Sequence, residues 1–326
     1  MTDSIDVLVI GSYVQDHCWQ TERAPERGET CLGAFSTGPG GKGFNQAIAA
    51  HRQGVSTCFM GAIGDDALGA VARRFASDDG LRAEWFVCAD APTAASSIVL
   101  DARGDNRIVV ALGANEKLGV AQVRARESLI SQAKVLLMQL ETDLDGVHEA
   151  LSIARAQGVT TLLNPAPLHP KLDPATLRYA DIITPNETEF ALLIEKLGGT
   201  AAACRDARAA ATLPDDALHE LSRSTGVPTV VITLGCHGCF VSHADPALRR
   251  DADAAYRIAP EAVNAIDTTG AGDAFSGGLA AGLVLFAQRP FRTAVVRGNR
   301  VAALSTETIG TAPAMPDRAR VEARFA

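Results

Sequence analysis

The chain lacks the features that mark several large classes of protein. Only 5% of its 326 residues are aromatic, and no apolar run reaches the ~18 residues that a membrane-spanning helix needs. Lysine and arginine form no cluster and the net charge is −8, which argues against a nucleic-acid partner. The first residues, Met1–Asp6, are acidic and lack the basic start of a signal peptide. We therefore expect a cytoplasmic protein that binds neither nucleic acid nor a membrane.

Cysteines are few and unevenly placed. There are seven, an odd number spread over a long chain, which does not suit a disulfide-stabilised domain. Cys236 and Cys239 have CxxC spacing, but no second CxxC exists that would complete a four-ligand metal site. A redox or metal role for this pair is therefore not expected.

Short β-rich runs alternate with helical patterns along most of the chain. Hydrophobic residues make up 47% of it, enough for a large core. The expected strands are residues 5–10, 135–140, 160–163, 182–183 and 230–233, and the expected helices are residues 45–52, 66–77, 145–157, 187–197 and 215–224. This alternation predicts an α/β fold with a doubly wound, mostly parallel sheet flanked by helices. Ligands bind such sheets beyond the carboxyl ends of the strands.

Two segments do not follow the alternation. Residues 29–36 read as a short strand, and residues 96–101 and 107–111 read as a hairpin. We expect a single domain spanning residues 1–326, with a small β-sheet lid formed by segments of about 15–38 and 94–112. Residues 198–214 are Ala-rich and polar, and are predicted to be a surface excursion.

The most informative stretch is the tract from Asp267 to Asp273, which an apolar run follows at once. Its glycines allow a tight turn into a helix, whose first turn has unpaired N–H groups and partial positive charge. Such a helix end attracts phosphate. Asp273 lies in the same turn, where a carboxylate can take a proton from a hydroxyl. The combination suits phosphoryl transfer to an alcohol.

A second Gly-rich turn, residues 38–46, also leads into a helix. It is not a Walker A motif, because Gly43 stands where the motif requires Ser or Thr after Gly-Lys. Gly270-Ala271-Gly272 is likewise a poor dinucleotide fingerprint, because its third glycine would fall at Phe275. In the first turn, Lys42 and Asn45 can donate hydrogen bonds to a ligand.

Several acidic and amide residues follow predicted strands. Asp16 and Glu141 are placed where carboxylates can accept hydroxyl groups of a sugar. Asn186 and Glu189 are three residues apart at a helix start, a spacing that suits Mg²⁺ binding through water. Acidic residues in a first turn are also common as simple compensation of the helix dipole.

Together these motifs resemble the ribokinase family, the PfkB carbohydrate kinases, over nearly the whole chain. The motifs that carry the resemblance are residues 40–46, 64–69, 138–141, 164–167, 184–189, 233–238 and 267–273. The resemblance implies ATP-dependent phosphorylation of the 5-hydroxyl of a free pentose, D-ribose or 2-deoxy-D-ribose. It also implies a homodimer formed through the lid. A nucleoside or fructose as acceptor, and a non-catalytic sugar or nucleotide sensor, are the alternatives.

The resemblance also implies site residues. Asp273 matches the general base, and the backbone of Gly270, Ala271 and Gly272 matches an anion hole. Positions matching sugar contacts are Val14, Asp16, Gly41, Lys42, Asn45 and Glu141. Positions matching Mg²⁺, phosphate and nucleotide contacts are Asn186, Glu189, Thr233, Gly235, Gly238 and Asn299. Positions matching a monovalent-cation site that favours K⁺ are Asp267, Thr269, Ser305, Thr308 and Gly310.

Two positions depart from the family pattern. Ribokinases usually carry Asn two residues before the sugar-binding Asp, where this chain has Val14. A hydroxyl placed against an apolar side chain without a partner costs about 1–3 kcal/mol. Val14 therefore favours 2-deoxy-D-ribose or another modified pentose, unless Tyr13, Gln15 or water compensates. Ala314 replaces a serine near the cation site, and we expect K⁺ activation to survive with weaker affinity.

Overall fold

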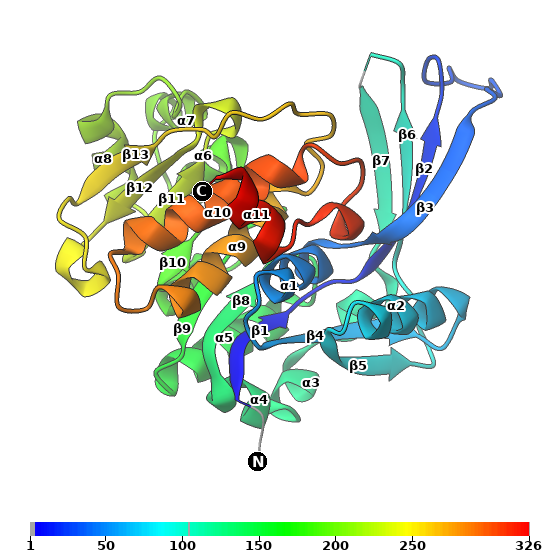
Figure 1. The fold of residues 1–326 in the computed structure, drawn as a ribbon, viewed down its shortest axis with the longest axis horizontal. Helices are drawn as coiled ribbons and strands as arrows, with labels where there is room; N and C mark the ends of the chain where they lie inside the picture. The colour runs from blue at the N-terminus through cyan, green and yellow to red at the C-terminus, as the bar shows by residue number, and fades with distance from the viewer. Residues whose placement is uncertain (1–3, 104, 326) are drawn as a thin grey trace.

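The centre of the molecule is a nine-stranded sheet. The computed structural model describes residues 4–103 and 105–325. The strands run in the order β13-β12-β11-β10-β9-β8-β1-β4-β5 (Figure 1). Their bounds are β1 Ile5–Ile10, β4 Thr57–Gly64, β5 Arg82–Cys88, β8 Ala133–Met138, β9 Thr160–Leu163, β10 Ile182–Ile183, β11 Thr229–Thr233, β12 Cys239–His243 and β13 Ala255–Ile258. The seven strands β11, β10, β9, β8, β1, β4 and β5 are parallel, and β12 and β13 are antiparallel additions at one edge.

Helices cover both faces of this sheet because its strands are apolar on both sides. In β1, Leu8 and Ile10 face one core, and Val7 and Val9 face the other. The second core packs against α1 (Lys42–Arg52), α2 (Ala67–Asp78), α9 (Ala271–Leu285), α10 (Phe291–Ser305) and α11 (Arg318–Arg324). The first packs against α3 (Val120–Arg124), α4 (Glu127–Gln132), α5 (Leu144–Ala156), α6 (Glu187–Lys196), α7 (Ala201–Arg208) and α8 (Asp215–Arg223). The predicted doubly wound fold is confirmed.

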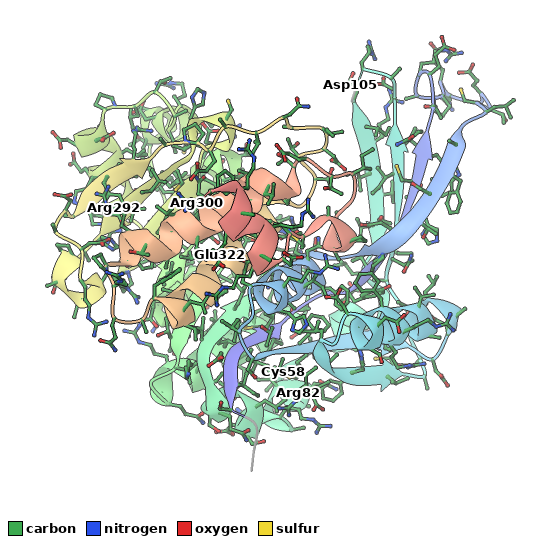
Figure 2. All side chains as sticks on the ribbon, viewed as in Figure 1. Cys58, Arg82, Asp105, Arg292, Arg300 and Glu322 are labelled. Atoms are coloured by element: carbon green, nitrogen blue, oxygen red, sulfur yellow. The ribbon has the colours of Figure 1, made fainter. Side chains whose placement is uncertain are left out.

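A separate four-stranded sheet forms the lid. Its strands run in the order β3-β2-β6-β7, and their bounds are β2 Val14–Gln20, β3 Ala34–Gly40, β6 Ala95–Leu100 and β7 Asn106–Ala111. Figure 1 shows these strands rising away from the body of the molecule. Asp105 lies at the free end of the lid, far from Arg82 on β5 (Figure 2). The small second sheet was predicted from the out-of-phase segments. Gly104, in the expected hairpin turn, lies outside the described residues.

Several local predictions were wrong. The strand expected at residues 29–36 begins at Ala34 and runs to Gly40, because it must pair with β2 in register. Residues 198–214 are largely exposed, as expected of a surface excursion, but the helix α7 within them was not predicted. Strands β4, β5, β12 and β13 were not predicted. No helix in the described part of the chain combines the length and apolar character of a membrane span.

Candidate active site

The tract before α9 forms the turn that the sequence predicts. Gly270 caps α9 with φ of 77°, a left-handed conformation that favours glycine because residues with a Cβ rarely adopt a positive φ. The helix begins at Ala271. The Ala271 N–H donates to the Thr268 carbonyl at 3.2 Å, whereas the N–H groups of Gly272 and Asp273 have no intrahelical partner. They lie at the carboxyl edge of the sheet, beside the residues that follow β9, β10 and β11. This end of α9 offers a place for an anion.

Asp273 lies in that first turn and is held by two amides. Its side chain is only 5% exposed. The Nδ2 group of Asn45 donates to Oδ2 at 2.9 Å, and the Nε2 group of Gln46 donates to Oδ1 at 3.0 Å. Both amides come from α1, more than two hundred residues earlier in the chain. The packing of α1 against α9 therefore places an oriented carboxylate at the anion-binding helix end.

A cavity of about 150 Å³ lies directly in front of Asp273. Its lining includes Lys42, Asn164, Asn186, Glu189, Gly270 and Asp273. Burial alone would lower the pKa of Lys42, but the charges of Asp273, Glu141 and Glu189 outweigh it and raise the pKa above its usual value. The lysine therefore stays cationic where a transferred phosphoryl group would fit.

Two carboxylates on the lid side of Asp273 are anchored by hydroxyl and backbone donors. Ser96 donates to Oδ1 of Asp16 at 2.6 Å, and Thr311 lies 3.4 Å from Oδ2. Oε2 of Glu141 accepts from Ser12 Oγ at 2.6 Å and from the backbone N–H of Lys42 at 3.0 Å. Burial raises the pKa of both carboxyls. Each is held rigidly, as an acceptor for hydroxyl groups would have to be.

The sequence suggested that Asp16 follows a strand of the large sheet. In the structure it lies within the lid strand β2. Alternation along a strand puts Val14 on the same face as Asp16 and puts Tyr13 and Gln15 on the other face. The Tyr13 hydroxyl donates to Gln15 Oε1 at 2.6 Å, and Gln15 Nε2 donates to Thr37 at 2.7 Å. Because these two side chains bond each other, neither supplies the polar group that is missing at the buried Val14.

A larger cavity, of about 660 Å³, adjoins the small one. The two share Asn186, Thr233 and Gly272. Of the positions matched to the nucleotide, it contains Asn186, Thr233, Gly235, Gly238 and Asn299. Apolar residues such as Pro260, Val263 and Phe275 supply the remaining wall. An elongated ligand with a flat apolar end and a charged end fits this shape, with its charged end at α9.

Asn186 and Glu189 form a capping box at the start of α6. The Asn186 backbone N–H donates to Oε2 of Glu189 at 2.9 Å, and the Glu189 N–H donates to Oδ1 of Asn186 at 2.8 Å. The two residues therefore do cap the helix, and both also line the small cavity. Burial raises the pKa of Glu189. Within residues 4–103 and 105–325, no three His, Cys, Asp or Glu side chains gather as a metal site.

The residues matched to a monovalent-cation site lie in the turn before α9 and at the end of α10 with the loop that follows it. Oδ1 of Asp267 accepts from Thr269 N–H at 2.9 Å, and Oδ2 accepts from Gly310 N–H at 3.0 Å. The Thr308 N–H bonds the Ser305 carbonyl at 3.2 Å. The Ser305 hydroxyl donates to the Ala302 carbonyl at 2.8 Å, and Ala314 has no side-chain oxygen. Any cation here would be held mainly by backbone carbonyls.

Comparison with known proteins agrees with this geometry. The model of the pfkB family of carbohydrate kinases matches residues 4–318. The chain belongs to this family. It is therefore a phosphotransferase with an alcohol acceptor.

Individual relatives cover almost the whole chain. Mouse ribokinase is 36% identical over 313 residues, covering 95% of this chain and 91% of the relative. A deoxyribokinase of Salmonella typhi is 32% identical over 278 residues, covering 84% of each chain. A structure of Arabidopsis thaliana ribokinase complexed with ribose and ATP superposes with a TM-score of 0.80 at 25% identity, covering 99% of this chain and all of the other.

Some residues of this pfkB-family site had no predicted role. Ser12, Ser96 and Thr311 anchor the carboxylates, and Gln46 and Asn164 extend the polar contacts of Asp273. Gln46 and Asn164 lie within conspicuous motifs and could have been singled out. Ser96 and Thr311 carry no local signal, because only the fold brings them to Asp16. The CxxC pair is separated by structure: Cys236 is exposed and Cys239 is buried in β12.

Proposed function

We propose that the protein is an ATP-dependent kinase that phosphorylates the 5-hydroxyl of a free pentose. The observation that carries the proposal is the position of Asp273, which is buried, held by two amides and placed in the first turn of α9. The names of its relatives, ribokinases and deoxyribokinases, support a pentose as acceptor. The ribose and ATP bound to the Arabidopsis relative support ATP as the phosphoryl donor.

The proposed reaction follows from the charges around the small cavity. Asp273 accepts the proton of the sugar's 5-hydroxyl, and the resulting oxygen attacks the γ-phosphorus of ATP. The bond to the β-phosphate oxygen then breaks and ADP leaves. Negative charge that develops on the phosphoryl oxygens meets the N–H groups at Gly270–Gly272 and the Lys42 ammonium.

The larger cavity and its edges supply the remaining contacts. The nucleotide lies along Thr233, Gly235, Gly238 and Asn299 in this proposal. Asn186 and Glu189 would hold Mg²⁺ through water and phosphate oxygens, which suits a site with one carboxylate and no acidic cluster. Mg²⁺ would neutralise phosphate charge. Asp267, Thr269, Ser305, Thr308 and Gly310 would frame a K⁺ site built largely from backbone carbonyls.

The sugar lies between the body and the lid in this proposal. Asp16, Glu141 and Asn45 face its hydroxyl groups, and Gly41 and Lys42 close the turn beside them. Val14 favours 2-deoxy-D-ribose over D-ribose, because Tyr13 and Gln15 bond each other instead of serving that position. The relationship to a deoxyribokinase is in keeping with this preference. A nucleoside or fructose remains the alternative acceptor.

A homodimer through the lid is part of the proposal. The lid exposes large apolar side chains, including Phe35 at 55%, Ile108 at 50% and Val109 at 73% exposure. Exposed apolar side chains of this kind favour an interaction site on this sheet. We place the enzyme in the cytoplasm, where ATP is available.

The first test is ATP turnover by the purified protein with Mg²⁺ and K⁺, comparing 2-deoxy-D-ribose with D-ribose. We expect turnover with both and a higher kcat/KM for the deoxy sugar. A strong preference for ribose would reject the assignment of Val14 while keeping the pentose kinase. Turnover with neither sugar, but with nucleosides or fructose, would replace the acceptor. Failure with every acceptor would leave a sensor.

A further inference from the structure

A chain of buried amides continues from Asp273 into the core of the molecule. Gln46 Nε2 donates to Asp273 Oδ1 at 3.0 Å and to Asn164 Oδ1 at 3.1 Å. Gln139 Nε2 donates to Gln46 Oε1 at 2.6 Å. Gln46 is fully buried and Gln139 is 1% exposed. The chain runs through α1 and the segments that follow β8 and β9.

The two groups at which this series of amides ends, the Thr184 carbonyl and the Asp273 carboxylate, fix the direction of the hydrogen bonds between them. Asn164 Nδ2 donates to the Thr184 carbonyl at 2.8 Å, and a carbonyl can only accept, so Asn164 Oδ1 is an acceptor. The ionised carboxylate of Asp273 can also only accept. Gln46 must therefore turn its NH₂ group toward both, which leaves its Oε1 to accept from Gln139.

At the end of this series of amides farthest from Asp273, one buried oxygen is left without a hydrogen-bond partner in the described part of the chain. Gln139 Oε1 is buried and has no hydrogen-bond partner within the described residues. It lies against Gly11, where an added Cβ would be only 2.0 Å away. An unpartnered buried acceptor destabilises a protein unless it serves some purpose. Rotating the Gln139 amide by about 180° would break its hydrogen bond to Gln46 and would place Gln139 Oε1 against Gln46 Oε1, two acceptors that cannot bond each other.

We propose that Gln46 and Gln139 are positioning residues that hold Asp273 as a proton acceptor facing the sugar. The proposal rests on the proposed kinase function. Every group that touches the carboxylate from the core side is an amide N–H, which does not give up its proton near neutral pH. On the cavity side, Asp273, Glu141 and Glu189 raise the pKa of Lys42, so the lysine keeps its proton and the sugar hydroxyl is the donor available to Asp273. Gln139 acts through Gln46, because it fixes which end of that amide meets the base.

A purely structural role for these glutamines predicts different behaviour. Core polar groups that only hold the fold together would, when replaced, lower stability and lower turnover equally at all pH values. Loss of a donor to a carboxylate disfavours its charged form, so that form is then reached only at higher pH. The pH dependence of turnover therefore separates the two roles.

The test uses Gln46→Met and Gln139→Met, which remove the amides and keep the length of the side chain. Gln53→Met is the matched control. Gln53 is also a fully buried glutamine at the end of α1, but it donates to the Pro316 carbonyl at 2.9 Å, away from Asp273. Turnover is measured against pH with saturating ATP and sugar, beside the thermal midpoint of each variant.

We expect Gln46→Met to lower kcat at neutral pH by about ten- to a hundredfold, the scale of a lost hydrogen bond to a charged group. The acidic limb of its kcat profile should move to higher pH, with partial recovery in alkaline buffer, while KM for ATP stays within about twofold. Gln139→Met should move the limb in the same direction by less. Gln53→Met should lower the thermal midpoint and leave the limb in place.

A second measurement does not depend on activity. The carboxyl signal of Asp273 in protein labelled with ¹³C-aspartate is assigned by its loss in Asp273→Asn and is titrated in each variant. Its midpoint should rise in Gln46→Met and Gln139→Met and should not rise in Gln53→Met. Unchanged midpoints, or a uniform loss of kcat at all pH values, would overturn the proposal. An inactive wild-type protein with the expected midpoints would instead count against the kinase function alone.

Discussion

The carboxyl edge of the large sheet and the lid sheet face the same site, yet they are built in opposite ways. Around Asp273 the side chains are polar and closed off, with Gln46 fully buried and Asn45 4% exposed. On the lid the side chains are apolar and open to solvent, as in Phe35 and Val109. Polar groups in a closed site keep one arrangement because each must find a partner. In the function proposed above, the body would fix the chemistry and the lid would supply surface for sugar and partner.

The link between these regions is narrow. Asp16 belongs to the lid strand β2, but its carboxylate meets Thr311 from the C-terminal loop. Thr311 also donates to the Pro39 carbonyl at 3.1 Å, in the lid strand β3. The loop that frames the proposed cation site therefore contacts the lid directly. Variants on either side of this link can test whether the regions divide the work as the contrast suggests.

The largest effect on turnover is expected at the buried Asp273 in the body of the molecule. Asp273→Asn removes the proton acceptor and should lower kcat by roughly 10²–10⁴, the usual scale for a positioned acid–base group. Steady-state kinetics with a pentose measure the loss. Asp251→Asn is the control, because the Asp251 side chain is also buried, at 3% exposed, but lies beside His243. That variant should lose stability and keep its kcat. Near-normal turnover by Asp273→Asn would remove it from the role of base.

A smaller effect is expected at the boundary with the lid. Asp16→Asn should lower kcat/KM for the sugar by about ten- to a hundredfold, because a neutral amide accepts hydroxyl groups less strongly than a carboxylate. Substrate-dependence curves at saturating ATP measure this ratio. Ser96→Ala, which removes only one donor to Asp16, should lie between the wild type and Asp16→Asn. Unchanged kcat/KM in Asp16→Asn would separate the lid strand from sugar binding.

The same variant should be more stable than the wild type at neutral pH. Burial raises the pKa of Asp16 above its unfolded value, although hydrogen bonds from Ser96 and Thr311 partly offset this. The folded state then binds the proton more tightly, so stability falls as pH rises from the usual Asp range through the raised pKa. Asp16→Asn removes this loss of stability, because asparagine does not titrate. Thermal unfolding at pH 7 and at pH 4 should show a gain in the midpoint at pH 7 that shrinks at pH 4.

Specificity is expected to change on the lid face without loss of the chemistry. Val14→Asn should raise the ratio of kcat/KM for D-ribose over 2-deoxy-D-ribose by about 5- to 100-fold, because the amide can partner the additional hydroxyl. Both sugars are compared in competition for one enzyme sample. Val14→Ile, which stays apolar, should leave the ratio within about threefold of the wild type. An equal ratio in Val14→Asn would mean that this position does not face the 2-hydroxyl.

The smallest effect on catalysis is expected from the outer surface of the lid. Val109→Glu should weaken the proposed homodimer by at least about tenfold in its dissociation constant, because it places a charge on apolar surface. Sedimentation of both proteins over a range of concentrations measures this. Val71 on α2 is 41% exposed, and Val71→Glu should leave the association unchanged. A wild-type protein that is monomeric at all concentrations would exclude the dimer.

The order of elements could be read from the sequence because it depends on local patterns. The predicted α/β alternation and the turn into α9 were found, since apolar periodicity and glycine positions act within a few residues. Strands β4 and β12 were missed because Gly, Cys or His interrupts their apolar runs, and β5 and β13 were missed because charged residues do so. All four gain their strand identity from pairing. The strand expected at 29–36 was shifted because register depends on the partner β2.

The candidate site divides in the same way. Its glycines, Asp273 and the residues after each strand stand out in the sequence, since helix ends and strand ends have local signatures. Ser96 and Thr311 do not, because Thr311 lies 295 residues from the carboxylate that it approaches. The exposed Cys236 and buried Cys239 also show that a spacing motif says nothing about which way its side chains point.

The sequence by itself determined the doubly wound fold, the glycine turn into α9 and the family, because these follow from local periodicity, turn chemistry and ordered motifs. Only the tertiary structure decided which groups touch Asp273, which way the Gln46 amide points and that Tyr13 and Gln15 satisfy each other. Asn45 and Asp273 are 228 residues apart and meet only when α1 packs against α9. Contacts of that kind depend on how the whole core closes, and no local stretch of the chain encodes them.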